Sequence, residues 1–462
     1  AANAPRRAAE ANNLGLPSLS ADGVNAIDRA AQMPTAFREA SKGSRILERT
    51  FPQWSPRPFF RHEILHRSRR EGSRARVGRL ITPHGAVDTP GFVPVGTNGA
   101  VKFVDHHLAD EAGMQLMFAN TLHLSVHPGA DVVGAAGGLH RFMGRARGPI
   151  ITDSGGFQIF SFANRGKRAM PGTAEAADGD GSAADVPWEV KSRRNAASRQ
   201  KYSTAHGGTD VQVTEEGARF RSYRDGSPLF LTPETSVAAQ KAIGADIIIP
   251  LDDLPAAGTH THNLAESVER THRWAARSLW THLEDPREQA MYGVIHGGTD
   301  LQLRLHSAET LKAMPFDGYC IGGSLGRDRA EMFQLLRHVT PMLPIGKPNH
   351  LLGIGDEESI RVGVTLGIDT FDSCWPTRMG RHGTLLTHQG PIKISRSQYK
   401  NDFTLADEQS DGFVARNYTR AYLHHLVKAH EPSVHGLLTL QNIKYMMDLM
   451  ASIRDQIFRN EI

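Results

Sequence analysis

The chain has 462 residues, of which 53 are Lys or Arg and 49 are Asp or Glu, so its formal net charge is +4. Hydrophobic residues make up 39% and charged residues 22%, a balance typical of a globular protein and not of a disordered one. No stretch approaches the roughly 18 consecutive apolar residues that a membrane-spanning helix needs. Cys320 and Cys374 are the only cysteines, which excludes a disulfide scaffold and a zinc site built on three or four thiolates.

The N-terminal segment 1–58 differs from the rest of the chain. It is rich in Ala, Arg, Asn and Ser and has few periodic apolar stretches. An Arg-bearing, Ala-rich head is typical of an organelle-targeting segment, which would place the protein in a mitochondrion or plastid. Several acids in the same segment are atypical of such signals. A partly disordered tail on a cytoplasmic protein is therefore the alternative.

A second unusual segment runs from about residue 163 to residue 210. It is too polar to bury a core, so we expect an inserted surface loop. Its part from 191 to 201 is strongly basic and contains no acid. The basic residues are Lys191, Arg193, Arg194, Arg199 and Lys201. They either contact phosphates of a nucleic acid or are simply solvated.

Short apolar runs alternate with helix-like stretches between about residue 80 and residue 380. The runs are GFVPVG (91–96), LMFAN (116–120), PIITDSGG (149–156), DIIIPLDD (246–253), MYGVIHGG (291–298), GYCIGGS (318–324), HLLGIG (350–355) and DTFDSCWP (369–376). Helical periodicity follows at 265–283 and 329–343. Alternating strands and helices predict parallel βαβ units, and eight of them predict an α/β fold with a closed (β/α)8 barrel of the TIM type.

Polar residues gather at the C-terminal ends of these runs. They are Asn120, Asp153, Asp252, Asp253, His296 and Asp372. In barrels of this type that end carries the active site. Four acids at one mouth indicate acid–base or covalent carboxylate chemistry, although any single Asp there could instead be a turn residue or a helix N-cap.

Glycine pairs accompany the acids, as at 155–156, 297–298 and 322–323. Glycine lets the backbone approach a flat ligand closely, whereas the alternatives are a phosphate cradle or plain tight turns. Neither GxxxxGK[ST] nor a strand-linked GxGxxG occurs, so a nucleotide cofactor is disfavoured.

Longer motifs extend these patterns. They are FVPVGTNGAVK (92–102), ANTLHL (119–124), GGLHRFMG (137–144), DSGGFQIFS (153–161), EEGARFRSYRDGSPLFLTPE (215–234), GADIIIPLDD (244–253), VIHGG (294–298), GYCIGG (318–323) and the segment 351–394 with TFDSCWPTRMGR. Together they resemble the tRNA-guanine transglycosylases, which exchange the wobble guanine of certain tRNAs for a 7-deazaguanine base. The resemblance covers about residues 59 to 458 apart from the insert.

The resemblance implies roles for individual residues. Asp372 matches the family nucleophile, and Asp153 matches the general acid/base. Residues expected to bind the base are Asp252, Phe157, Gln158, His296, Gly323, Leu352 and Asn120. Arg378 and Arg381 match the arginines that hold the anticodon backbone, and the insert residues Lys191, Arg193 and Arg194 add further RNA contacts. His296 stands where family members usually have glutamine.

The family also carries a zinc site in its C-terminal part, built on C-x-C-x2-C and a later histidine. The corresponding positions here are Ser410, Gly412, Ala415 and Gln441. We therefore expect no metal and no cofactor. A nearby group of histidines could still hold a metal, but solvated neutral side chains are the simpler interpretation. These histidines are His424, His425, His430 and His435.

These inferences divide the chain into three parts. We expect an N-terminal extension at 1–58, acting as a targeting remnant or docking arm, a catalytic barrel at 59–400, and a C-terminal helical subdomain at 401–462 without the zinc motif. The predicted function is tRNA-guanine exchange, with the tRNA anticodon arm and a 7-deazaguanine base as partners. The alternative is an altered homologue that serves as a structural or RNA-contacting subunit of a larger, perhaps organellar, assembly. The sequence is compatible with a homodimer or a larger assembly but does not determine the oligomeric state.

Overall fold

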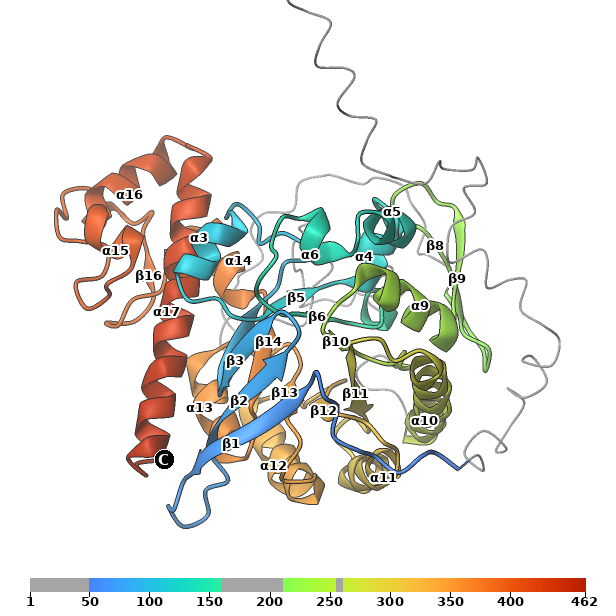
Figure 1. Cartoon of the computed structure of the whole chain (residues 1–462). Coiled ribbons are helices and arrows are strands. Elements are labelled where there is room, and N and C mark those ends of the chain that lie inside the picture. The colour runs from blue at the N-terminus through green and yellow to red at the C-terminus, as the bar shows by residue number, and fades with distance from the viewer. Residues whose placement is uncertain (1–49, 160–210, 255–260) are drawn as a thin grey trace, which may run out of the picture.

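The computed structural model describes residues 50–159, 211–254 and 261–462 (Figure 1). The predicted insert lies outside the described residues, and so do its basic residues and nearly all of the N-terminal extension. The organellar location, which depends on that extension, stays a prediction. Among the helices that the structure describes, none is long and apolar enough to cross a membrane.

A parallel eight-stranded sheet curls into a barrel at the centre of the molecule. Its strands are β4 (Gly91–Pro94), β5 (Met117–Ala119), β6 (Ile150–Thr152), β10 (Ile247–Ile248), β11 (Ala290–Ile295), β12 (Gly318–Ile321), β13 (Asn349–Leu351) and β14 (Thr370–Ser373). Their order is β4-β14-β13-β12-β11-β10-β6-β5. A parallel bridge between Val95 and Phe118 joins the first strand to the last. The predicted (β/α)8 barrel and all eight predicted strands are confirmed.

Helices surround the barrel strands, as Figure 1 shows. They are α3 (His106–Glu111), α4 (Thr121–Val126), α5 (Ala130–Ala135), α6 (Leu139–Phe142), α9 (Pro233–Ile243), α10 (Thr261–Glu284), α11 (Leu301–Lys312), α12 (Arg329–Val339), α13 (Glu357–Thr365) and α14 (Trp375–Arg381). Asp300, Asp328 and Asp356 start α11, α12 and α13, because each side chain accepts a backbone N–H of the first turn. The helix predicted at 329–343 ends at Val339, and Pro341 continues in the 3-10 turn η4 (Thr340–Met342) because proline has no N–H to donate.

Alternate residues of the strands fill the barrel interior. Phe118, Ile151 and Val294 belong to one buried cluster, whereas Met117 and Ile295, their neighbours in sequence, pack on the helices outside. The interior is therefore a packed core, and only the ends of the barrel are left for chemistry.

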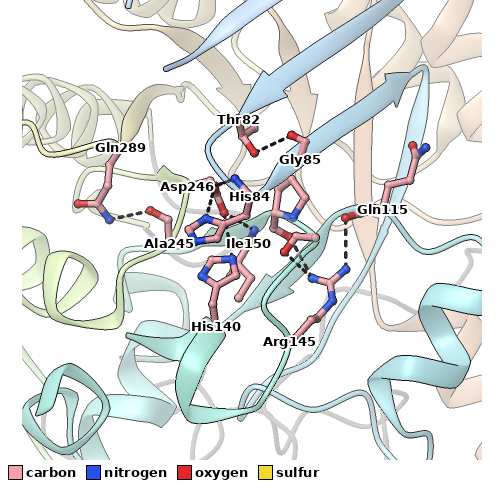
Figure 2. A network of polar contacts seen from close by, with 12 residues as sticks. Thr82, His84, Gly85, Gln115, His140, Arg145, Ile150, Ala245, Asp246 and Gln289 are labelled. Atoms are coloured by element: carbon pink, nitrogen blue, oxygen red, sulfur yellow. Dashed lines mark hydrogen bonds and ion pairs between the residues drawn. The ribbon is translucent and has the colours of Figure 1, made fainter. Parts of the chain in front are cut away.

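An antiparallel sheet covers the N-terminal end of the barrel. It contains β1 (Arg61–Arg67), β2 (Arg76–Thr82) and β3 (Gly85–Thr89). Leu80 of β2 and Val87 of β3 join the interior cluster of the barrel. Asp246 anchors the β2–β3 turn, because its carboxylate accepts the backbone N–H and ring Nδ1 of His84 and the backbone N–H of Ile150 (Figure 2).

The described end of the N-terminal extension packs on the barrel. Trp54 Nε1 and Arg57 Nε both donate to Asp317 Oδ1, at 3.0 and 3.2 Å. Phe51 stacks on Trp280 with ring centroids 4.7 Å apart. This segment therefore docks against the residues that precede β12 and against α10.

Two additions flank the barrel. One is an antiparallel sheet of β7 (Gln212–Val213), β8 (Ala218–Arg221) and β9 (Pro228–Leu231). The other is C-terminal and contains β15 (Thr384–Leu385), β16 (Ile392–Lys393), η5 (Ser397–Tyr399), α15 (Phe413–Asn417), α16 (Arg420–Lys428) and α17 (Ser433–Phe458). Helix α17 runs along one side of the barrel and packs on α14 (Figure 1). Asn442 of α17 donates to the carbonyls of Pro376 and Thr384, which ties the two parts together. The predicted domain boundaries remain predictions.

Candidate active site

The C-terminal mouth of the barrel brings the predicted site residues together. Asp153 follows β6, His296 follows β11 and Leu352 follows β13, while Asp372 lies in β14 itself. Because the strands are parallel, these ends share one face of the barrel. Asp253 is different: its carboxylate pairs with Arg270 of α10 at 2.6 Å and helps to hold that helix. Three of the four predicted acids therefore remain for chemistry at the mouth.

Asp153 is held by three donors. Asn120 Nδ2 and Gln158 Nε2 donate to Oδ2 at 2.8 and 2.7 Å, and the backbone N–H of Thr121 donates to Oδ1 at 2.7 Å. Burial raises the pKa of Asp153 to about 6, although these hydrogen bonds lower it, and the charge of Asp252 raises it further. A carboxyl group with this pKa can both give and take a proton near neutral pH.

Asp252 is paired with His296. The distance from His296 Nε2 to Asp252 Oδ2 is 2.7 Å, and Ser154 Oγ donates to Asp252 Oδ1 at 3.1 Å. The other ring nitrogen of His296 faces Gly323, where a Cβ atom would lie only 2.7 Å from Nδ1. Gly323 also has a φ of 74°, so a side chain at this position would be strained as well as crowded.

Asp372 is held through one of its oxygens. His350 Nε2 lies 2.9 Å from Oδ1, and the backbone N–H of Gly353 donates to the same oxygen at 3.1 Å. The structure shows no hydrogen bond to Oδ2 among the described residues. Thr370 Oγ1 in turn lies 2.8 Å from His350 Nδ1 and fixes the ring. His350 was not predicted as a site residue. The signal was available, because it lies two residues before Leu352 and therefore faces the same side of β13.

Cys320 lies beneath these carboxylates but is not a nucleophile. It is fully buried in β12. Burial raises the pKa of its thiol well above the usual value, and the charges of Asp372 and Asp252 add to that increase. Cys320 is therefore a protonated thiol. Because the charges of both Asp372 and Asp252 act on this thiol, both carboxylates lie close to β12.

The walls of the mouth are apolar. Phe157 is 36% exposed, while its neighbour Gln158 is buried against Asp153. Leu352 is partly buried, and a Cβ atom on Gly322 would lie 2.9 Å from its Cδ1 atom. The glycine pair after β12 therefore leaves room for Leu352 beside the His296–Gly323 wall. An exposed aromatic ring and an aliphatic side chain suit a flat ligand.

Arg304 of α11 joins two loops of the mouth from below. It is fully buried, and its guanidinium donates to four carbonyl groups. These belong to Ile295 at the end of β11 and Gly298 after it, and to Gly322 and Ser324 after β12. Burial lowers the pKa of Arg304 to about 9, which still leaves it protonated near neutral pH.

Arg378 and Arg381 lie on α14, directly after the strand that carries Asp372. Both side chains are partly buried. Arg378 Nη2 lies 2.9 Å from Cys374 Sγ. The predicted RNA-contacting arginines are thus at the mouth, whereas Lys191, Arg193 and Arg194 lie outside the described residues.

The positions that match the family zinc ligands lie close together in the C-terminal part. A Cβ atom on Gly412 would be 3.2 Å from Ser410 Oγ and 3.6 Å from Gln441 Oε1. Both amide atoms of Gln441 are buried without a hydrogen-bond partner. Zinc needs thiolate, imidazole or carboxylate ligands, so Ser410, Gly412, Ala415 and Gln441 do not fit this metal. Of the predicted local histidines, His424 is buried, and its Nδ1 lies 2.8 Å from the carbonyl oxygen of Ile394.

Other groups of potential metal ligands contain none of the residues placed at the mouth. Among the described residues they are His84, His140 and Asp246, then Asp105, His106 and His107, and finally Glu269, His272 and His306. His84 and His140 stack with ring centroids 3.5 Å apart and planes 10° from parallel. Their lone pairs cannot converge on one ion in this arrangement. The hydrogen bond to Asp246 raises the pKa of His84, which favours a structural ion pair at this end of the barrel (Figure 2).

Comparison with known proteins identifies the family. The family model described as Queuine tRNA-ribosyltransferase matches residues 71–189 and 170–462. The protein of that name from Protochlamydia amoebophila is 49% identical over 399 residues, covering 86% of this chain and 95% of its own. The one from Chlamydia caviae is 48% identical over 400 residues, covering 86% and 98%, and the one from Chlamydia muridarum is 45% identical over 403 residues, covering 87% and 99%. The resemblance seen in the motifs is confirmed, and the chain belongs to the queuine tRNA-ribosyltransferase family.

Proposed function

We propose that this chain is a tRNA-guanine transglycosylase, a pentosyltransferase that exchanges the wobble guanine for a 7-deazaguanine base through a covalent aspartyl–ribosyl intermediate. The observation that supports this most is the placement of three carboxylates at one mouth, each with a different set of donors. Within the described part of the chain, one oxygen of Asp372 has no hydrogen bond, Asp153 has a raised pKa, and Asp252 is paired with His296.

Asp372 is the nucleophile in this proposal. Its Oδ2 atom attacks C1′ of the target ribose while the bond from C1′ to the guanine nitrogen breaks. His350 and Gly353 hold Oδ1 and so orient Oδ2. The carboxylate traps the oxocarbenium-like sugar on one face of the ribose, and the new base then displaces it from the opposite face. The two inversions leave the configuration at C1′ retained.

Asp153 moves the proton. In its protonated form it gives a proton to the departing guanine, and as a carboxylate it takes one from the incoming base. The proton that Asp153 gives to guanine is replaced by the one that it takes from the new base. The enzyme therefore ends in its starting protonation state. A pKa of about 6 places both forms within reach near neutral pH.

The base lies between Phe157 and Leu352 in this arrangement. Asp252 reads its edge, because Oδ1 accepts from Ser154 alone among the described residues and keeps a lone pair for an N–H of the base. Gly323 brings backbone close to the ring, and His296 fixes the Asp252 carboxylate. Asn120 and Gln158 act through Asp153, which they hold, and contact the base from the same side.

The RNA partner is the anticodon arm of a tRNA. The target base must leave its stack to reach the mouth, which costs a few kcal/mol and costs least in a single-stranded loop. Arg378 and Arg381 are well placed to bind phosphates of that loop, because a guanidinium forms paired hydrogen bonds to phosphate oxygens. Lys191, Arg193 and Arg194 add contacts farther out.

Exchange of labelled guanine into tRNA by the purified chain tests the proposal. We expect incorporation by the wild type and none by Asp372→Asn. Denaturing gels of enzyme mixed with tRNA and a base analogue should show an adduct that Asp372→Asn lacks. An adduct that survives in Asp372→Asn would exclude Asp372 as nucleophile. Tight tRNA binding without any exchange would instead favour the RNA-contacting subunit considered above.

A further inference from the structure

Three potential metal ligands meet on the outer surface of the barrel, where α10 packs beside α11. Glu269 and His272 lie one turn apart on α10, and His306 lies on α11. Their ligand atoms all lie within 4.8 Å of one another. This cluster is separate from the mouth and from the C-terminal positions that match the family zinc ligands.

His272 is the unusual member of the cluster. Its side chain has an exposed fraction of 0%, and its Nδ1 atom is buried without a hydrogen-bond partner. The other ring nitrogen, Nε2, lies 3.1 Å from Ser307 Oγ. When Nε2 carries the ring proton and donates it to Ser307, Nδ1 has a bare lone pair on the side of Glu269. Histidines that bind metals are commonly held in this way through their second nitrogen.

We propose that Glu269, His272 and His306 form a binding site for a divalent transition metal, with Zn²⁺ as the best match. Two imidazoles and one carboxylate are a ligand set that zinc accepts, with water in the fourth position. No residue of the cluster is a thiolate, so a softer metal such as Cu(I) is disfavoured.

The distances suit this ion. His306 Nε2 lies 2.6 Å from Glu269 Oε1, and His272 Nδ1 lies 3.7 Å from Glu269 Oε2. Ligand atoms bound to one tetrahedral zinc lie about 3.3 Å apart, which is between these two values. Only exposed side chains need to move, because Glu269 is 45% and His306 49% exposed while His272 stays fixed.

Ring orientation also distinguishes this cluster from the stacked pair of His84 and His140. The rings of His272 and His306 are tilted by 63°, with centroids 5.3 Å apart. Lone pairs on tilted rings can converge on one ion, whereas those on parallel stacked rings cannot.

A metal here would join α10 to α11 and orient Ser307. The same Ser307 Oγ accepts the backbone N–H of His296 at 3.2 Å. The site is therefore connected through one hydroxyl group to the residue that pairs with Asp252. We expect metal binding to stiffen this wall of the mouth and to stabilise the barrel.

Zinc titration of the full chain, stripped with a chelator and in competition with a chromophoric chelator, tests the proposal. We expect one equivalent to bind. His306→Ala and Glu269→Gln should each weaken binding by at least about 10–100-fold, because each removes a direct ligand and loss of an outer-shell partner alone costs that much. Both side chains are exposed, so neither change should prevent folding. Co²⁺ in place of zinc should give the visible absorption of a tetrahedral site, and His306→Ala should lose it.

His338→Ala is the matched control, because His338 is an exposed histidine on the neighbouring α12. It should bind zinc as the wild type does. The proposal is wrong if the wild type binds no zinc, or if His306→Ala binds it with unchanged affinity. It is also wrong if His84→Ala, and not His306→Ala, removes the bound equivalent.

Discussion

Asp153 experiences opposing influences on its ionisation. Burial disfavours the carboxylate, while hydrogen bonds from Asn120, Thr121 and Gln158 favour it. The resulting pKa of about 6 is above the usual value of 3.8 for an aspartate. The donors therefore do more than hold the side chain, because they also set the pH range in which it can act as an acid.

Asn120→Ala tests this influence. The change removes a donor to the carboxylate, so the pKa of Asp153 should rise by about one unit. The limb of the kcat/KM profile that reports Asp153 should move to higher pH by the same amount. Gln158→Ala should move it in the same direction. A limb that stays in place, or moves to lower pH, in both variants would show that Asp153 does not produce it.

His350 is a positioning residue for Asp372. His350→Ala should slow formation of the covalent adduct by roughly 100-fold, because a displacement of about 1 Å at the reacting atom can cost that much. The KM for tRNA should change little, since His350 is buried away from RNA. His350→Gln should recover part of the rate, because its amide can donate to Oδ1. Equal loss in both variants, together with a lower melting temperature, would indicate a purely structural role.

The predicted and the missed residues differ in how they act. Asp153, Asp252 and Asp372 were predictable because acids at strand ends meet at one mouth. His350 and Ser154 were missed because their importance depends on hydrogen bonds between strands that are distant in sequence. Asp253 looked equivalent to Asp252, and only the position of Arg270 shows that it faces a helix.

Helix α14 carries Arg378 and Arg381, which we propose contact RNA, and the helix packs closely on α17. A Cβ atom on Gly380 would lie 2.8 Å from the backbone nitrogen of Thr439. Gly380→Ala should therefore separate the helices, lower stability by about 1–3 kcal/mol and weaken tRNA binding. Urea unfolding and a binding titration would measure the two effects. Gly346→Ala is the control, since a Cβ atom there meets nothing within 4 Å.

A lysine holds the part of the C-terminal subdomain where the family has zinc. Lys444 Nζ lies 2.6 Å from Asp411 and 2.5 Å from Asp448, joining the loop before α15 to α17. Lys444→Met should lower the free energy of unfolding by about 1 kcal/mol.

A chelator should leave unfolding of a His306→Ala chain unchanged. A large loss of stability on chelation in that variant would show that the C-terminal part does hold a metal.

At the level of elements, the barrel and the C-terminal helices were predictable, and the antiparallel sheets that flank the barrel were not. Apolar runs of strand length with polar ends marked each barrel strand. The sheet of β1, β2 and β3 was not predicted: β1 alternates between partly buried and exposed residues, whereas β2 is mostly buried, so its strands share no single apolar pattern. Pro341 explains why a helix predicted as one piece is divided.

The candidate active site lies at the C-terminal end of the barrel, and an antiparallel sheet covers the N-terminal end. The sheet of β1, β2 and β3 covers the N-terminal end of the barrel, so the proposed function assigns the RNA to the C-terminal mouth. The family and fold could be read from motifs spread over the chain. The N-terminal extension and the insert allowed no such inference, because their polar composition has no periodic pattern from which packing can be inferred.

RNA binding by the whole chain should depend on salt through two sets of basic residues, namely the arginines of α14 and the basic residues of the insert. Neutralising Lys191, Arg193, Arg194, Arg199 and Lys201 together should weaken tRNA binding at low salt. The slope of log K against log salt should fall by about 0.7 for each lost phosphate contact. Base selection should not change, because phosphate contacts carry no sequence information. An unchanged slope would show that the insert does not bind RNA.

Arg304 donates hydrogen bonds to four backbone carbonyls, and these bonds join the loops after β11 and β12 so that neither can move without the other. Transplanting residues 322–327 from a relative to alter base preference would disturb carbonyls on which the loop of His296 also depends. Chimeras should therefore succeed only when both loops and α11 are exchanged as a block. The same bonds imply that substitutions in one loop are compensated most readily in the other, so the two loops are expected to diverge together among relatives.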